Sequence, residues 1–330
     1  MLQVSVIREN TKEVIERLAV KNFQGEAIVN NIIDLDNRRK KIQSELDALL
    51  SEANNIAKEI GELFKTGKAA EANDLKNKSV AIKESSKVLQ DELSSIEEEI
   101  KNQLYLIPNL PHKSVPKGKT PEDNEVVYSE GDIDKPLENA KPHWELAKQY
   151  DIIDFELGVK ITGAGFPVYK GKGARLQRGL INFFLDEAQK AGYEEYLPPL
   201  LVNEASAIGT GQLPDKEAQM YHVGLDNFYL IPTAEVPVTN IHRDVIYRSE
   251  DLPIKNTAYT PCFRREAGSY GKDVRGLNRL HQFDKVEIVQ VQRPYNSYNA
   301  LEEMVEHVKG LIKKLNLPFR ILRLCGGDMS

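Results

Sequence analysis

The stretch TPCFRREAGSYGKDVRGLNRLHQFDKVEIV, residues 260–289, has strand-like apolar ends and an interior rich in arginine and glycine. Val286, Ile288 and, just beyond this stretch, Val291 are the apolar positions from which we predict a β-strand. The residues before this strand include five cations: Arg264, Arg265, Lys272, Arg275 and Arg279. Two strands joined by so cationic a loop indicate a hairpin that binds an anion.

The spacing within this stretch suggests a nucleotide. If FRRE, residues 263–266, continues the strand, Arg264 and Glu266 share one face. A guanidinium suits a phosphate and a carboxylate suits an exocyclic amine. Arg279 and Phe283, four residues apart, are expected on one face of the return strand, where the ring of Phe283 offers a stacking surface for a base. The competing interpretation is a surface ion pair between Arg264 and Glu266, with Phe283 in the core.

The composition limits the class of protein. The chain has 330 residues, a net charge of -6 and 41% hydrophobic residues, which is typical of a two-domain globular protein in which any nucleic-acid site is a local basic patch. Cys262 and Cys325 lie far apart without a metal-ligand spacing, so we expect neither disulfide nor zinc site. No stretch approaches the length of an apolar membrane span. We therefore expect a cytoplasmic protein with no membrane association.

The first hundred residues contain two heptad patterns. The first has apolar residues at Leu35, Ile42, Leu46, Leu49, Ala53, Ile56, Ile60 and Leu63, and the second at Leu75, Ile82, Leu89, Leu93, Ile96 and Ile100. The short link KTGKAAEAN, residues 65–73, predicts an antiparallel helical hairpin, because parallel helices would need a much longer connection. About 35 residues per helix give an arm of roughly 50 Å. Such an arm serves either as a spacer or dimerisation element or, through its distal lysines, as a phosphate-binding surface.

The rest of the chain predicts an antiparallel α+β domain. Four prolines mark a linker after Leu104: Pro108, Pro111, Pro116 and Pro121. We expect helices from Lys141, over 175–190 and over 301–317. We expect strands in YEEYLPPLLV, residues 193–202, in FYLIPTAEVPV, residues 228–238, and in the hairpin. Pro198 and Pro199 place the first of these strands at a sheet edge or an interface.

A family resemblance covers essentially the whole chain. FRRE, the glycine-rich loop and RLHQFDKVE resemble motif 2 of class II aminoacyl-tRNA synthetases, specifically of the seryl-tRNA synthetases. The helical hairpin, the motif-1-like strand with Pro198, GTGQLP at 209–214 and PTAEVPV at 232–238 follow in the family's order. The resemblance implies a tRNA-binding domain over 1–110, with its coiled-coil arm at about 27–103, and a class II catalytic domain over 111–330 built on an antiparallel sheet with flanking helices.

The resemblance also implies roles for individual residues. The ATP-binding positions would be Arg264, Arg265, Glu266, Arg279, Leu280 and Phe283. The serine-binding positions would be Thr233, Ala234, Glu235, Arg264 and Glu287. The tRNA-binding positions would be Lys65, Lys68, Lys76, Lys78, Lys83, Lys272 and Arg275. Catalysis is expected to come from Arg264, Arg279 and the Mg²⁺ ions that accompany ATP, with no side-chain nucleophile and no metal held by protein ligands alone.

Further expectations concern partners and extent. The resemblance implies serine tRNA, L-serine and ATP as substrates, and a homodimer; selenocysteine tRNA remains a possible second acceptor. His281 is expected to have a structural role. The family's motif 3 and its ATP-binding arginine would follow LRLCGGDMS, so we expect a chain truncated within the catalytic domain that adenylates serine poorly by itself.

Three other functions remain open. A catalytically silent synthetase-like protein that binds RNA would keep the arm, although Arg264, Glu266, Arg279, Phe283 and Glu287 argue for activity. A ligase that loads an amino acid onto a carrier protein would lack the arm. A purely structural coiled-coil protein leaves motif 2 unexplained.

Overall fold

The computed structural model describes residues 2–133, 139–215, 218–266 and 275–329, which form two compact units. The first unit consists of residues 1–129 with 320–330, and the second of residues 130–319. The predicted α+β class is confirmed: a long helical hairpin belongs to the first unit, and helices pack against small, mainly antiparallel sheets in the second.

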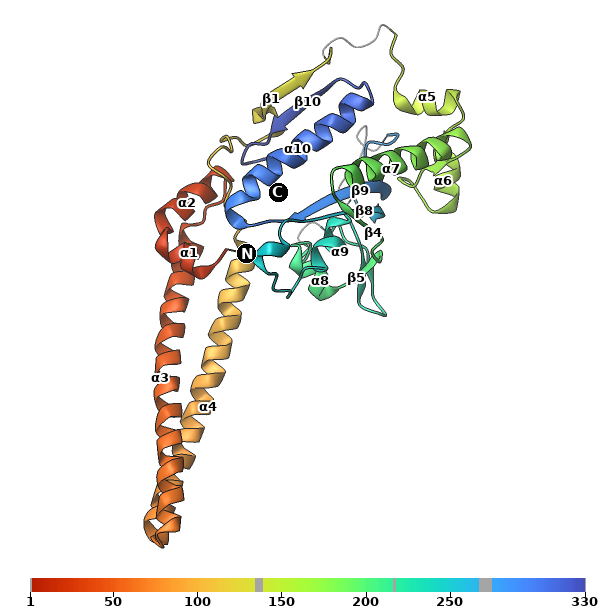
Figure 1. The fold of residues 1–330 in the computed structure, drawn as a ribbon. Helices are drawn as coiled ribbons and strands as arrows, with labels where there is room; N and C mark the ends of the chain where they lie inside the picture. Colours follow the sequence, from red (N-terminus) through yellow and green to blue (C-terminus); the bar gives the residue numbers. More distant parts are fainter. Residues whose placement is uncertain (1, 134–138, 216–217, 267–274, 330) are drawn as a thin grey trace. The chain divides into compact units, whose positions relative to one another are not determined.

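The hairpin of the first unit consists of α3 (Glu26–Lys65) and α4 (Ala69–Leu106), which run side by side along their length (Figure 1). Its apolar seam matches the predicted heptads, with buried residues Leu35, Ile42, Leu46, Ile56, Ile82, Leu93, Ile96 and Ile100. Gly67, in the turn between the helices, has a φ of +76°, a conformation that glycine adopts without strain. The two heptad patterns therefore bury each other within one chain.

Short elements complete the first unit. Helices α1 (Val4–Glu9) and α2 (Thr11–Val20) pack Ile7, Val14 and Leu18 against the first turns of α3. Strands β1 (Glu125–Glu130) and β10 (Phe319–Arg323) pair with each other, and the 3-10 turn η1 (Pro121–Asp123) precedes β1. One buried residue of α3 breaks the apolar pattern, since the side chain of Asp36 lies within this core region.

The second unit is organised around β8 (Ile254–Phe263) and β9 (Gln282–Val291), an antiparallel pair in register from Ile254 opposite Val291 to Phe263 opposite Gln282. Strand β4 (Glu194–Tyr196) joins β8 in parallel and lies at the edge of this described sheet, the position expected for the segment that precedes Pro198 and Pro199. Helices α7 (Lys172–Lys190) and α9 (Glu235–Asn240) both pack against the β8–β9 pair. This rigid pair positions the candidate site.

The remaining elements of this unit surround the sheet. Before α7 come α5 (His143–Gln149), β2 (Ile153–Asp154), α6 (Phe155–Ile161) and β3 (Val168–Tyr169). A second sheet of order β5-β7-β6 contains β5 (Leu201–Asn203), β7 (Phe228–Leu230) and β6 (His222–Val223), and α8 (Glu204–Gly209) follows β5. The turns η2 (Ser249–Asp251) and η4 (Pro294–Asn296) flank the long strands, and α10 (Ser297–Lys314) follows them.

Two strand predictions are wrong in part. YEEYLPPLLV is not one strand: β4 ends at Tyr196 and β5 begins at Leu201, because Pro198 and Pro199 cannot donate to a ladder. In FYLIPTAEVPV only β7 is extended, and Glu235–Asn240 is the helix α9. Pro237 fits there because the first-turn N–H groups of a helix have no acceptor within the helix.

Replacing Gly158 with alanine is expected to lower the melting temperature of the second unit. A Cβ at this position of α6 would lie 1.6 Å from the carbonyl oxygen of Phe166, so the backbone must move. Overpacking of this kind costs about 1–3 kcal/mol, which corresponds to several degrees. Gly310→Ala, in α10 with no atom within 4 Å of the added Cβ, is the matched control. Equal melting temperatures for the two variants, measured by circular dichroism, would contradict the prediction.

Candidate active site

The open end of the β8–β9 hairpin carries the arginine-rich residues. One more backbone bond continues the pairing, from Arg264 N to His281 O at 3.0 Å, but Glu266 has a φ of +48°. This left-handed conformation ends the extended geometry, so the prediction that residues 263–266 form a strand is wrong beyond Phe263. Arg279 likewise lies before β9 rather than on it.

Arg264 and Phe283 nevertheless lie together. The guanidinium carbon of Arg264 is 5.2 Å from the centroid of the Phe283 ring, and its Nε donates to Pro232 O at 3.3 Å. The ring of Phe283 is half-buried, with the guanidinium over its face. The segment that follows β7 is bonded to the same hairpin end, because Phe263 N donates to Ile231 O at 2.8 Å. The geometry therefore brings a cation, an aromatic face and residues 231–233 to one place.

Glu266 pairs with Arg279. The Nη1 atom of Arg279 lies 3.2 Å from Oε2 of Glu266, and this is the described ion pair of Glu266 in place of the Arg264–Glu266 pair left open by the sequence. The arginine side chain is largely exposed and the glutamate is largely covered. Because the arginine is open to solvent, such an ion pair contributes little stability, and the arginine can exchange it for a ligand with stronger charge.

A second polar cluster surrounds Glu287 on β9. The hydroxyl of Thr233 donates to Oε2 of Glu287 at 2.9 Å and accepts from the backbone N–H of Glu235 at 3.2 Å. Lys285 forms an ion pair with the same oxygen, Oε2 of Glu287. Both described side-chain partners therefore hold one carboxylate oxygen, and the Oε1 atom has no side-chain partner among the described contacts.

Lys285 is absent from the residues that the sequence singled out. The sequence could have indicated it, because residues two apart on a strand share a face and Lys285 precedes Glu287 by two.

The remaining predicted serine-binding positions differ in exposure. Ala234 is fully buried against Val238 and Ala258, so it offers a ligand only backbone atoms, whereas Glu235 begins α9 with an exposed side chain.

Two residues at this end of the hairpin, His281 and Asp284, make side-chain contacts with neighbouring segments. His281 Nδ1 lies 2.7 Å from the hydroxyl of Tyr221, and its ring stacks on Phe166 at 5.2 Å, which are contacts expected of a structural residue. Asp284 accepts from Tyr259 at 2.7 Å and from Gln177 at 2.6 Å. Burial and the bond to Asp284 raise the pKa of Tyr259 to about 12. These contacts hold the two strands at the site.

The positions predicted to contact tRNA lie on different parts of the chain. Lys272 falls outside the described residues. Arg275 stacks over Trp144 at 5.3 Å and, with Leu280, lines a cleft of about 620 Å³ that does not include Arg264 or Phe283. The arm lysines lie on the first unit: Lys78 pairs with Glu52 at 2.7 Å, which raises the pKa of the lysine, and Lys76 lies 4.8 Å from the Phe64 ring. Lys68 pairs with Glu71, while Lys65 and Lys83 are exposed.

No group of three His, Cys, Asp or Glu side chains that could hold a metal ion occurs among the described residues. None of the described helices is long and apolar enough to cross a bilayer.

Comparison with known proteins gives consistent matches. The model of the seryl-tRNA synthetase N-terminal domain matches residues 1–111, and that of the class II tRNA synthetase core domain (G, H, P, S and T) matches residues 221–330. The chain is 46% identical to the serine–tRNA ligase of Salinibacter ruber over 330 residues, covering 100% of this chain and 77% of the relative. It is 45% identical to that of Prosthecochloris aestuarii, with the same coverage.

A solved structure also matches over the whole chain. Seryl-tRNA synthetase from Pyrococcus horikoshii, crystallised with ATP, superimposes with a TM-score of 0.90 at 31% identity, covering 100% of this chain and 78% of that one.

Proposed function

The chain belongs to the serine–tRNA ligase family of class II aminoacyl-tRNA synthetases, and on that premise we propose that it activates L-serine with ATP and transfers it to the 3′ end of serine tRNA. The observation that carries the proposal is the adjacency of two clusters at one hairpin. Arg264 and Phe283 suit a nucleotide, and Thr233, Lys285 and Glu287 suit an amino acid.

ATP binding is proposed at the hairpin end. Arg264 would hold the α-phosphate and Phe283 would stack on adenine, because a guanidinium and an aromatic ring in contact present both chemistries side by side. Arg279 would leave Glu266 for the terminal phosphates, which carry more charge, and Glu266 would then accept from the adenine amine. Arg265 and Leu280 would complete the nucleotide site.

Serine binding is proposed around Glu287. Thr233 and Lys285 fix its Oε2 atom, so that Oε1 is left for the ammonium or the hydroxyl of serine. Buried polar groups that require a hydroxyl discriminate strongly against alanine, because the analogue leaves them unpaired. Glu235 and the backbone of Ala234 would line the same pocket, and Arg264 would bind the serine carboxylate.

The reaction then proceeds in two displacements. A serine carboxylate oxygen attacks the α-phosphorus of ATP, the α–β bridging bond breaks, and pyrophosphate leaves. A ribose hydroxyl of the tRNA then attacks the carbonyl carbon, AMP leaves, and the hydroxyl proton passes to the departing phosphate or to water. The chain contributes orientation and charge neutralisation by Arg264 and Arg279. Mg²⁺ is proposed to enter as part of the substrate MgATP, whose phosphates it would neutralise together with the two arginines.

The remaining assignments follow from the family. We propose serine tRNA as the partner of the arm, cytoplasmic location, and a homodimer. Exposed apolar side chains on α6 and α7, namely Val159, Ile161 and Leu176, support a partner surface there.

The test is serine-dependent exchange of pyrophosphate into ATP by the natural gene product that carries this sequence, followed by charging of serine tRNA. We expect exchange with serine and none with alanine. Tight tRNA binding without any exchange would instead favour the catalytically silent RNA-binding alternative.

Shortening the arm is expected to separate the two steps. Glu52 and Lys78 face each other across the hairpin at 2.7 Å, so residues 53–77 can be replaced by a short glycine turn without disturbing the core near α1 and α2. The loss of Lys65, Lys68 and Lys76 should reduce charging efficiency by about tenfold or more, because each phosphate contact contributes to affinity. Exchange should be unchanged. Normal charging by the shortened protein would refute a role for the distal arm.

A further inference from the structure

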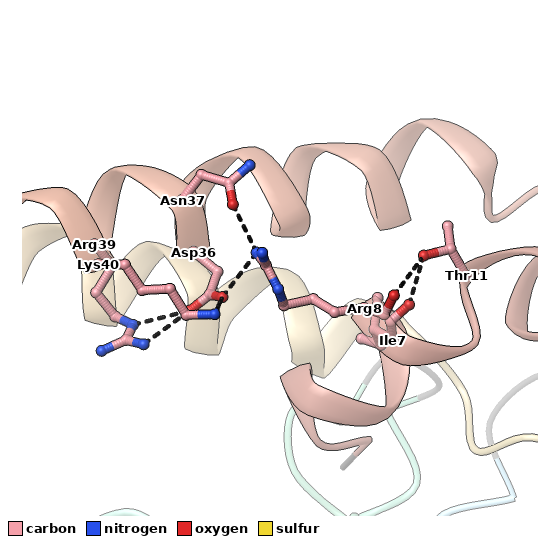
Figure 2. Close-up of polar contacts among 7 residues, drawn as sticks. All are labelled: Ile7, Arg8, Thr11, Asp36, Asn37, Arg39 and Lys40. Atoms are coloured by element: carbon pink, nitrogen blue, oxygen red, sulfur yellow. Dashed lines mark hydrogen bonds and ion pairs between the residues drawn. The ribbon is translucent and has the colours of Figure 1, made fainter.

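Asp36 is a buried carboxylate in the N-terminal part of α3, the part against which α1 and α2 pack, and only 2% of its surface is exposed. Three cations contact it (Figure 2). Nη1 of Arg8, from α1, lies 3.0 Å from Oδ2, and Nζ of Lys40 lies 3.1 Å from the same oxygen. Arg39 donates to Oδ1 through Nε at 3.0 Å and Nη2 at 2.9 Å. We call Arg8, Asp36, Arg39 and Lys40 the Asp36 cluster.

The charges of this cluster do not balance. One carboxylate faces three cations, which leaves a formal surplus of two positive charges. The other contact of Arg8 is the neutral amide oxygen of Asn37, at 2.7 Å (Figure 2). Among the contacts described for the three cations, Asp36 is the only anionic partner. Burial raises the pKa of Asp36, but the hydrogen bonds from Arg39 and Lys40 outweigh this and lower it, so the carboxylate stays charged.

Among the described ion pairs, the neighbouring basic residues of α3 do not share a carboxylate with other cations. Arg38 has Glu92 of α4 at 3.7 Å, and Lys41 has Glu45 at 3.9 Å, so each has its own carboxylate. The surplus is therefore concentrated on Arg8, Arg39 and Lys40 in a chain whose net charge is -6. A local excess of fixed positive charge attracts anions even when the whole protein is acidic.

The cations remain accessible although their partner is buried. The side chains of Arg8, Arg39 and Lys40 are 30%, 30% and 53% exposed, so solvent reaches part of each head group. The carboxylate holds them in one place, and pre-ordered cations lose less conformational entropy when an anion binds. The three head groups are partly exposed rather than enclosed, which suits the phosphate of a polymer better than a small ion that needs to be enclosed.

We propose that Arg8, Arg39 and Lys40 bind a backbone phosphate of the RNA substrate, with Asp36 as the residue that positions them. This inference rests on the proposed function and adds a contact near the first turns of the arm, separate from the lysines of its distal half. Guanidinium groups recognise phosphate with two parallel hydrogen bonds, and such contacts fix the position of RNA without reading its sequence.

The experiment compares Lys40→Met with Lys12→Met in the full-length protein. Lys12 lies on α2, is 90% exposed, and has its nearest described carboxylate, Glu16, at 4.0 Å, so its removal is a matched loss of one charge. Binding of serine tRNA is measured by filter retention over a range of salt concentrations. Lys40→Met should weaken binding about three- to tenfold and reduce the salt slope by about one, and Arg8→Met should do the same from another helix. Lys12→Met should change neither the affinity nor the salt slope, and Lys40→Arg, which keeps the charge, should leave both near their native values.

Each contrary outcome has one meaning. Equal affinity and slope for Lys40→Met and Lys12→Met overturns the phosphate site. A lower melting temperature of Lys40→Met with unchanged tRNA affinity also overturns it, and shows an ion-pair network that only stabilises the fold. Serine-dependent pyrophosphate exchange is followed on the same preparations: its absence from the unaltered protein would count against the proposed function, whereas normal exchange with unaffected tRNA binding would count against this site alone.

Discussion

Replacing Arg264 with methionine is expected to lower kcat/KM for serine-dependent pyrophosphate exchange by about 10²–10³-fold, the usual effect of losing one group that stabilises developing charge. Arg264 is held by Pro232 O and by the face of Phe283, so its charge is placed before substrate arrives. A group that is already in position needs no reorganisation during the reaction. Steady-state exchange rates at varied ATP and serine give both kcat and KM.

Two variants make this result specific. Arg264→Lys keeps the charge but loses the planar fork and the stacking on Phe283, so its activity should fall between those of methionine and the native residue. Arg248→Met removes an arginine that pairs with Glu250 and Asp251 in the same unit, and should leave exchange unchanged. If Arg264→Met folded normally and retained near-native exchange, the α-phosphate role would be wrong.

The helical arm could be predicted from sequence because a heptad pattern is a local signal. Buried residues such as Ile42, Leu46 and Ile96 lie where the pattern placed them. The prediction of α9 as a strand failed because VPV alternates like a strand while Pro237 sits in the first turn of a short helix. A short segment of this kind is decided by tertiary packing, here of Val236 and Val238 in the core.

For the candidate site, sequence reasoning proposes residues but not the contacts that they make. The motif resemblance identified Arg264, Phe283 and Glu287. Strand alternation wrongly predicted an extended backbone at Glu266, because no sequence pattern indicates a left-handed φ at a glutamate. The partners of Glu287 and of Asp36 depend on which segments fold together. Arg8 lies 28 residues from Asp36 in the chain, and periodicity carries no information at that separation.

Replacing Glu287 with glutamine is expected to raise the KM for serine about 10- to 100-fold while the KM for ATP changes little. A hydrogen bond to a charged group contributes about 1.5–3 kcal/mol, and each 1.4 kcal/mol is about tenfold. Glutamine keeps the shape of the side chain but loses its charge, which removes an attraction for the serine ammonium. It also presents an amide to Thr233 and Lys285, and leaves the lysine without an ion-pair partner in a half-buried position.

The Lys285→Met variant separates these two effects. It leaves the charge on Glu287 but removes one of the two groups that hold Oε2, so the serine KM should rise less than in Glu287→Gln, with kcat lowered because the carboxylate is less well positioned. Both variants should bind ATP normally, as measured by direct titration without serine. Equal increases in the KM values for serine and ATP in Glu287→Gln would mean that the carboxylate supports the whole hairpin rather than the amino acid. Because Thr233 and Lys285 bind the same oxygen, a serine-specific defect would in turn assign the Oε1 atom to the substrate.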